Sequence, residues 1–292
     1  MLLNHRIARP DMTAEDVEMW RTLVADRSGL FFTDSRLYFL GQRLWERMRQ
    51  HNLASYMDYY RYIMLDRNGE QEWAALLEGL VNNETRFFRH EPSFAALRER
   101  VLPQLWQQQQ AQNGLNLWSV GCSAGQEVYS LAMLLLETAV FPPQHIHITG
   151  SDISGSKLAQ AKNGRYRHFE IRSLPEAYRR KYMREYQQGH DQLFEVRSPL
   201  RQITEFRYLN LQAPEWHTTT QHDVVFCQNV LVYFSNETRL KILQRLCERI
   251  TPGGYLFLAP TDVVSLRLPG MRPVYFPDAL VYQRVAHTAT EN

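Results

Sequence analysis

Cysteine is scarce in this chain, and long apolar runs are missing. The three cysteines, Cys122, Cys227 and Cys247, form no CxxC pair, which argues against a disulfide framework and against a zinc site. The longest apolar stretch, residues 131–141, is interrupted by Glu137 and is too short to cross a bilayer. The first residues carry no apolar segment of the kind found in secretory signals. We therefore expect a cytoplasmic protein that is not inserted in a membrane.

No charge of one sign dominates either. Lys and Arg number 33 and Asp and Glu 31, a net charge of +2, so the overall charge does not indicate a nucleic-acid partner. Apolar residues make up 44% and charged residues 22% of the 292 residues, which is close to an average globular chain. This composition excludes a disordered, collagen-like or coiled-coil protein, and the length allows about two domains.

Residues 12–80 predict a series of helices with almost no strand signal. Thr13 precedes an apolar periodic run and is followed three residues later by Asp16, which is close to a capping box. Residues 35–50 carry apolar side chains at helical spacing. We therefore expect a helical N-terminal domain over residues 1–85.

After this domain, strand-like runs alternate with helical ones. The strand-like runs lie at residues 115–120, 145–151, 203–209, 222–228 and 254–260. Such alternation is typical of a mostly parallel sheet with helices on its faces. Two further short runs flank Pro277 and Asp278 and predict a terminal antiparallel hairpin.

One block of the second half is strongly basic. Residues 157–207 contain 12 Lys or Arg and 6 Asp or Glu, a net charge of +6. The block includes a stretch between two expected strands that is longer than a simple crossover. Two interpretations stay open: a solvated insert, or a docking surface for an acidic protein partner.

The expected strand at residues 115–120 runs into a glycine-rich turn, Gly121–Gly125, before a helix begins. Such a turn lets a ligand approach the backbone at the carboxyl edge of a sheet. The same residues match G-x-S-x-G, the nucleophile elbow of α/β-hydrolases, with Ser123 as the nucleophile. Its partners would come from Asp223, Asp262 and His287. The helical character of the preceding residues and the lack of an HGGG-type oxyanion loop disfavour a hydrolase.

A nucleotide-like cofactor is the other interpretation of this turn. It requires an acidic side chain at the end of the next strand, where the carboxylate can accept hydrogen bonds from two ribose hydroxyls. Asp152 stands there, 27 residues after Gly125. The structural alternative for Asp152 is an N-cap of the helix that begins near Ser154. Asp223 is interpreted as a strand-start residue.

Six segments spread over residues 80–260 carry a more specific signal. They are, in order, NETRFFR (83–89), VGCSAGQEVYS (120–130), SDI (151–153), NL (210–211), FCQNVLVYF (226–234) and TPGG (251–254). Together they resemble the motifs of the CheR chemoreceptor methyltransferases, among them N-x-T-x-F-F-R, G-C-S-T-G-E-E-P-Y-S and F-C-R-N-V-M-I-Y-F.

This resemblance implies an α/β fold of the Rossmann-like class I methyltransferase type over residues 86–292, with a small β-subdomain inserted at about 167–203. The helical domain, residues 1–85, would dock on the receptor. The reaction would move a methyl group from S-adenosylmethionine to glutamate side chains of a methyl-accepting chemoreceptor, leaving S-adenosylhomocysteine. The partner would be the receptor's cytoplasmic domain, and we expect a monomer with no nucleic-acid partner and no metal ion.

The resemblance also implies roles for individual residues. Arg89 and Tyr233 would act at the reacting groups. The cofactor would be bound by Asn83, Thr85, Arg89, Gly121, Glu127, Asp152, Asn210, Leu211, Gln228 and Asn229. Within this set, Glu127 would pair with the cofactor's amino group and Asp152 with its ribose.

The implied chemistry needs no general base, because an exposed glutamate has a pKa of about 4.3 and is ionised at neutral pH. The sulfonium methyl is already activated, so the protein has to align the two groups and exclude water. The sequence departs from the family pattern in four places: Gln126 replaces a Glu, Val128 replaces a Pro, Gln228 replaces an Arg, and residues 259–262 (APTD) replace G-H-S-E. These departures leave open a cofactor-binding but weakly active receptor-binding module.

Arg36, Arg43 and Arg47 fall within about 20° of one another on an ideal helix. They form either a solvated face or a stripe that docks against acidic side chains of a receptor. Phe87 and Phe88 are expected to be core residues rather than site residues.

Overall fold

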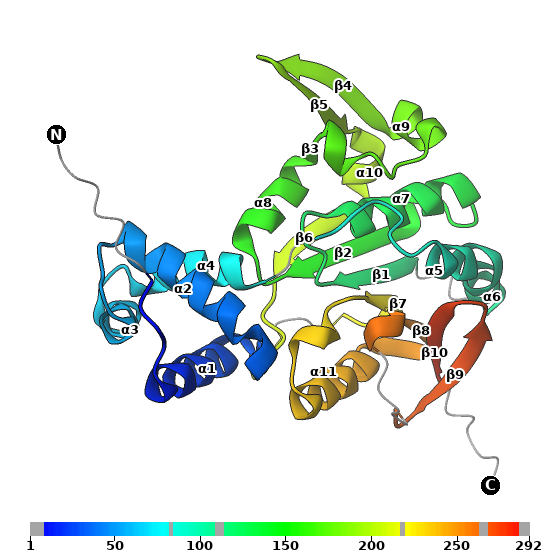
Figure 1. The fold of residues 1–292 in the computed structure, drawn as a ribbon. Helices are drawn as coiled ribbons and strands as arrows, with labels where there is room; N and C mark the ends of the chain where they lie inside the picture. Colours follow the sequence, from blue (N-terminus) through cyan, green and yellow to red (C-terminus); the bar gives the residue numbers. More distant parts are fainter. Residues whose placement is uncertain (1–8, 82–83, 109–113, 217–219, 263–267, 286–292) are drawn as a thin grey trace, which may run out of the picture. The chain divides into compact units, whose positions relative to one another are not determined.

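The computed structural model describes residues 9–81, 84–108, 114–216, 220–262 and 268–285. The chain divides into two compact units, residues 1–82 and 83–292 (Figure 1). Within the described ranges, no helix combines the length and the apolar character that crossing a membrane requires.

The N-terminal unit is helical, as predicted. It contains α1 (Ala14–Ser28), the 3-10 turn η1 (Asp34–Arg36), α2 (Leu37–Gln50), α3 (Tyr56–Leu65) and α4 (Gly69–Leu80). The predicted capping box is confirmed, because the Thr13 hydroxyl accepts the Asp16 N–H and the Asp16 carboxylate accepts the Thr13 N–H. Trp20 stacks on Tyr59 with ring centroids 5.2 Å apart, and both rings are fully buried.

A buried ionic network joins three helices of this unit around Glu72, which is 4% exposed. Its carboxylate accepts hydrogen bonds from Arg47 (2.8 and 2.5 Å), His51 (2.6 Å) and Tyr59 (2.6 Å). Burial alone would raise the pKa of Glu72, but these hydrogen bonds lower it below its ordinary value. Arg47 is therefore engaged inside the unit, which disfavours both a solvated face and a docking stripe at this position.

The second unit is built on a seven-stranded sheet in the order β6-β2-β1-β7-β8-β10-β9. The strands are β1 (Leu115–Val120), β2 (Ile146–Asp152), β6 (Thr204–Tyr208), β7 (His222–Cys227), β8 (Ile250–Leu258), β9 (Met271–Phe276) and β10 (Ala279–Arg284). The pairs from β6 to β8 are parallel, whereas β10 is antiparallel to both β8 and β9. The expected mostly parallel sheet with a terminal hairpin is confirmed.

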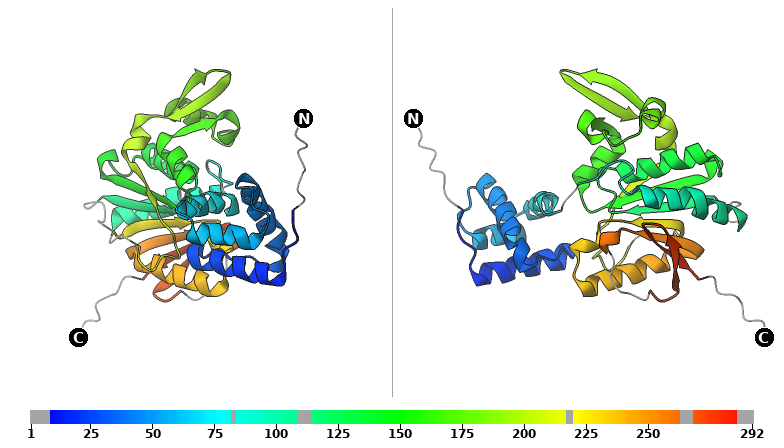
Figure 2. Two further views of the ribbon diagram at one scale, coloured as in Figure 1. Left: turned by 90° about the vertical axis from the view of Figure 1, so that its left-hand side faces the viewer. Right: turned by 45° about the vertical axis from the view of Figure 1, so that its right-hand side comes forward.

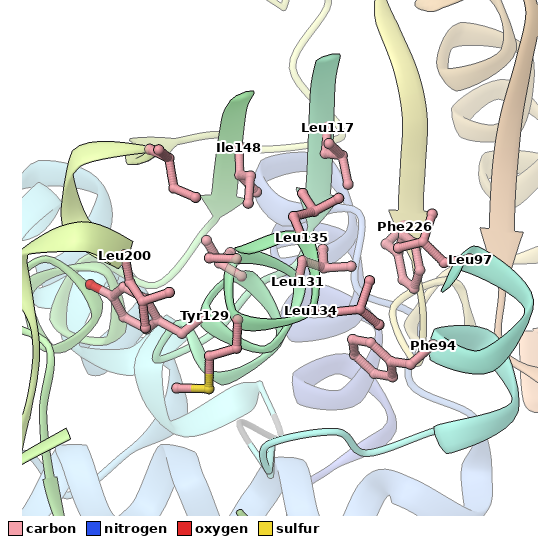
Figure 3. Packing of buried hydrophobic residues seen from close by; sticks show 14 of the residues in the cluster. Phe94, Leu97, Leu117, Tyr129, Leu131, Leu134, Leu135, Ile148, Leu200 and Phe226 are labelled. Carbon is pink, nitrogen blue, oxygen red and sulfur yellow. The ribbon is translucent and has the colours of Figure 1, made fainter. Parts of the chain in front are cut away.

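Successive strand residues face opposite sides of the sheet, and helices cover both of these apolar faces. Before β1 the chain forms α5 (Glu91–Ala96), the π-helical turn η2 (Leu97–Val101) and α6 (Leu102–Gln107), and later α7 (Gln126–Thr138), α8 (Gly155–Asn163), α10 (Ser198–Gln202) and α11 (Asn236–Glu248). Leu117 and Phe226 belong to the apolar cluster that includes α7, whereas Trp118 and Val225 belong to the cluster that includes α11. Figure 3 shows the α7 side chains beneath Leu117 and Ile148, with Phe94 next to Phe226.

The insert after α8 forms a separate antiparallel sheet of three strands, in the order β3-β5-β4. These strands are β3 (Arg165–Arg167), β4 (Met183–Gln188) and β5 (Asp191–Val196), with α9 (Glu176–Tyr182) ahead of β4. The small sheet stands away from the large one in both views of Figure 2. Glu195 pairs with Arg165 and Arg184, so part of the basic charge of this block is neutralised within it.

All three cysteines, Cys122, Cys227 and Cys247, are free thiols and buried. Burial raises the pKa of each thiol, that of Cys247 to about 11. These cysteines therefore pack as small apolar residues.

Candidate active site

The turn after β1 requires glycine at its first position. Gly121 has φ +68°, and a Cβ there would lie 2.3 Å from the Cγ2 of Val230. The N–H groups of Gly121 and Cys122 donate to the Ser151 carbonyl at 2.8 and 3.0 Å. The turn is thus fixed against the end of β2 on one side and against the segment after β7 on the other.

Asp152 ends β2 and is 8% exposed. Its Oδ2 accepts the Ser123 N–H at 2.7 Å and its Oδ1 accepts the Ser154 N–H at 2.8 Å. Ser154, rather than Asp152, caps α8, because its hydroxyl accepts the Lys157 N–H; the N-cap interpretation of Asp152 is therefore wrong. A carboxylate oxygen can accept two hydrogen bonds, so these backbone contacts are compatible with a role toward ribose hydroxyls.

Glu127 lies in the first turn of α7 and accepts a hydrogen bond from the Ser119 hydroxyl of β1 at 2.7 Å. Burial raises the pKa of Glu127 to about 7, although the Ser119 hydroxyl and the Arg89 guanidinium act in the opposite direction. The charge of Asp262 adds to the upward shift. A buried carboxylate in this state is stabilised by a cation placed beside it, which is the chemistry that an ammonium group offers.

Residues 87–89 include two side chains that pack in the core and one that is exposed. Phe87 is fully buried and contacts Tyr166 edge to face, and its neighbour Phe88 packs against the same cluster; the prediction that both are core residues is confirmed. Arg89 is exposed and donates to the Glu84 carbonyl at 2.8 Å.

Two further predicted residues come from this segment. Thr85 is half-buried. Asn83 lies outside the described residues, so its predicted role stays a prediction.

Gln228 and Asn229 follow β7 and are held by different partners. Gln228 is 7% exposed, and its amide donates to the Ser93 hydroxyl at 2.8 Å and to the Leu258 carbonyl at 3.3 Å. Asn229 has φ +60°, and its N–H donates to Asp262 at 2.7 Å. The Gln228 side chain thus binds the protein's own scaffold at the position where the family has a cationic residue.

The remaining predicted residues also follow strand ends. Asn210 and Leu211 come after β6; the Asn210 side chain accepts the Gln212 N–H at 2.9 Å, and Leu211 is 7% exposed in the α11 cluster. Tyr233 ends the short turn η6 (Leu231–Tyr233) after β7 and is half-buried. Because β1, β2, β6 and β7 are parallel, the described members of the set that follow them are assembled at the carboxyl edge of the sheet.

Of the two acids considered for a hydrolase, Asp223 is excluded by its position. Asp223 lies at the amino end of β7, the opposite edge from Ser123, and binds the Asn116 N–H at 2.9 Å and the Thr251 hydroxyl at 3.0 Å. Asp223 is therefore a strand-start residue, as predicted.

The other of these acids, Asp262, uses Oδ2 to accept the N–H groups of Asn229 and Ala259. His287 lies outside the described residues. The helical residues before β1 do not argue against a hydrolase, because β1 still lies inside the sheet, between β2 and β7.

Three residues shape this edge through contacts that the sequence did not predict. Ser119 binds Glu127, Val230 closes the space beside Gly121, and Asp262 binds the Asn229 amide. A polar serine in the buried second half of the strand LNLWSV was an available signal for the first. The other two depend on contacts between distant segments and left no local pattern.

Comparison with known proteins agrees with this geometry. Residues 83–274 match the SAM binding domain of CheR methyltransferases, and residues 15–81 match the all-alpha domain of the same family. The chain is 33% identical over 258 residues to chemotaxis protein methyltransferase 1 of Pseudomonas aeruginosa, covering 86% of this chain and 90% of that protein. It is 30% identical over 243 residues to the chemotaxis protein methyltransferase of Escherichia coli, covering 83% and 82%. With both of its domains matched in order over residues 15–81 and 83–274, this chain belongs to the CheR methyltransferase family.

Proposed function

We propose that this protein transfers the methyl group of S-adenosylmethionine to glutamate side chains of a methyl-accepting chemoreceptor. Its family and the names of its relatives support this activity. The observation that carries the proposal is the presence of two acidic side chains at the carboxyl edge of the sheet, Glu127 in the first turn of α7 and Asp152 at the end of β2, which suit the amino group and the ribose of this cofactor.

The residues present fit S-adenosylmethionine, which supplies an activated methyl group on a sulfonium centre when bound. Gly121 begins the turn at the carboxyl edge in a left-handed conformation, and a side chain there would clash with Val230. Asp152 would accept the ribose hydroxyls, and Glu127 would hold the amino group. Thr85, Asn210, Leu211 and Asn229, together with Asn83 and Gln228, complete the proposed cofactor set.

Toward the acceptor, the task of the chain is positioning. A glutamate side chain is ionised at neutral pH, so no residue has to remove a proton from it. Arg89 is exposed and carries a planar set of donors that suits a carboxylate. In this proposal Arg89 orients either the incoming glutamate or the cofactor's carboxylate, and Tyr233 borders the path to the methyl group.

The domain roles form part of the same proposal. Residues 1–85 would dock on the receptor's cytoplasmic domain, and residues 86–292 would carry catalysis, with the insert at about 167–203 as an accessory surface. We propose a monomer that works in the cytoplasm without a nucleic-acid partner. The arginines that support docking are Arg36 and Arg43; Arg36 lies over the Phe32 ring at 4.8 Å, and Arg43 pairs with Glu46.

The test is methyl transfer from tritium-labelled S-adenosylmethionine to membranes that carry the organism's receptors. We expect label on the receptor that mild alkali releases as methanol, because a glutamyl methyl ester is hydrolysed by base. Membranes with receptors whose accepting glutamates are replaced by alanine are the control and should stay unlabelled. Label that survives alkali would indicate a nitrogen acceptor and would refute the proposal.

A further inference from the structure

Asp262 is a buried carboxylate at the carboxyl edge that none of the proposed roles uses. It ends the short turn η7 (Pro260–Asp262) after β8 and is 1% exposed. Its Oδ2 accepts the N–H of Asn229 at 2.7 Å and the N–H of Ala259 at 3.2 Å. One carboxylate thus connects the segment that follows β7 to the end of β8.

The segment after β7, residues 228–234, is fixed at several points along its length. Gln228 binds Ser93 and the Leu258 carbonyl, and the next residue is held by Asp262. Asn229 adopts φ +60°, a left-handed conformation that asparagine adopts more readily than other non-glycine residues. A contact that holds Asn229 in this conformation determines where the following residues lie.

Those following residues reach the cofactor turn. Val230 fills the space beside Gly121, and the Tyr233 N–H donates to the Val230 carbonyl at 3.2 Å. A shift of residues 228–234 would therefore move the side chains that border Gly121 and, in the proposed function, the acceptor path at Tyr233.

The surroundings of Asp262 set it apart from an ordinary surface carboxylate. Burial raises its pKa, while the N–H groups of Asn229, Ala259 and Val232 act in the opposite direction. Its charge also reaches Glu127 and contributes to the raised pKa there. A buried carboxylate costs free energy unless hydrogen bonds compensate it, and here two of the three amides belong to residues 228–234.

We propose that Asp262 is a positioning residue for methyl transfer. By holding the Asn229 amide, its carboxylate fixes residues 228–234 against the Gly121 turn, so that the acceptor approaches the methyl group in line. This inference rests on the proposed function and adds to it a residue that makes no contact with either reactant.

Asp223 supplies a matched control. It is also a buried aspartate, 6% exposed, which accepts one backbone N–H and has a pKa raised by burial, but it lies at the amino edge of the sheet. Asp262→Ala, Asp262→Glu and Asp223→Asn are compared in the full-length protein, at a temperature well below the unfolding of each. The readouts are kcat and KM for receptor membranes and the Kd for S-adenosylhomocysteine.

We expect Asp262→Ala to lower kcat about 100-fold, the scale of loss that a misplacement of about 1 Å produces, with a smaller change in the Kd for S-adenosylhomocysteine. Asp262→Glu keeps a carboxylate and should recover part of kcat, whereas Asp223→Asn should lower the Tm and leave kcat and KM unchanged. If Asp262→Ala lowers the Tm with wild-type kcat and KM, or if Asp262→Glu recovers nothing, the positioning role is refuted. An inactive wild-type protein would instead refute the proposed function.

Discussion

The raised pKa of Glu127 predicts that cofactor binding releases a proton. In the ligand-free protein, burial raises the pKa of Glu127 to about 7, so about half of these side chains are protonated at pH 7. An ammonium group bound beside Glu127 favours the ionised form. Binding of S-adenosylhomocysteine, which carries the same amino group as the methyl donor, should therefore drive the proton off.

The size of the effect follows from the two protonation states. With a pKa of about 7, roughly one tenth of Glu127 is ionised at pH 6 and roughly nine tenths at pH 8. The Kd for S-adenosylhomocysteine should accordingly fall about tenfold between pH 6 and pH 8, with about half a proton released per ligand at pH 7.

The same shift affects stability in the absence of ligand. The folded-state pKa of this acid lies above its unfolded value of 4.5, so the folded state binds the proton more tightly. Stability is lost as the pH rises from about 4.5 to about 7, by about 3 kcal/mol in total. Ligand binding above pH 7 should offset part of this loss.

Isothermal titration calorimetry in two buffers with different ionisation enthalpies measures both the Kd and the protons released. Glu127→Gln is the control, since an amide keeps the shape of the side chain and cannot ionise; its Kd should be weaker and independent of pH from 6 to 8. A wild-type Kd that stays flat over this range would refute the assignment of Glu127 as the ammonium partner.

Four further substitutions have defined outcomes. Asp152→Ala should weaken S-adenosylhomocysteine binding about 10- to 100-fold through the loss of charge-assisted hydrogen bonds; an unchanged Kd by calorimetry would contradict the ribose assignment. Gly121→Ala should destabilise the protein by about 2–5 kcal/mol, from the left-handed backbone and the clash with Val230 together, and urea unfolding in a Val230→Ala background should show a smaller loss. Glu72→Ala should cost about 3 kcal/mol, because Arg47 is left unpaired. Since the pKa of Glu72 is lowered in the folded state, its contribution is present above about pH 4.5 and is lost as the pH falls further; stability that is equal in mutant and wild type at pH 7 would contradict this. Arg43→Glu should lower the rate of receptor methylation with no change in the Kd for S-adenosylhomocysteine, and an unchanged methylation rate would remove the docking role.

The features that the sequence predicted well are those set by neighbouring residues. Thr13 and Asp16 are three residues apart, so their capping box can be recognised in the sequence. The parallel strands and the terminal hairpin are visible as short apolar runs, and the predicted position of Asp152 at the end of one of them is confirmed.

Features that depend on distant segments were not predictable in this way. Helical spacing grouped Arg47 with Arg43, but the partner of Arg47 is Glu72, 25 residues away and on another helix. The bond between Asn229 and Asp262 spans 33 residues, and the family pattern presented Asp262 only as a departure. Periodicity shows which face of an element a side chain lies on, but not what that face meets.

The buried cysteines allow the opening of the carboxyl edge of the sheet to be measured by thiol alkylation. Cysteine reacts with alkylating reagents as the thiolate, which is the attacking nucleophile, and burial both shields these sulfurs and disfavours their ionised form. Cys122 sits in the turn after β1 and Cys227 at the end of β7, so labelling of either one requires this edge of the sheet to open. The rate of alkylation therefore measures how often the edge opens, and a ligand that holds it closed should slow the modification of Cys122 and Cys227 more than that of Cys247.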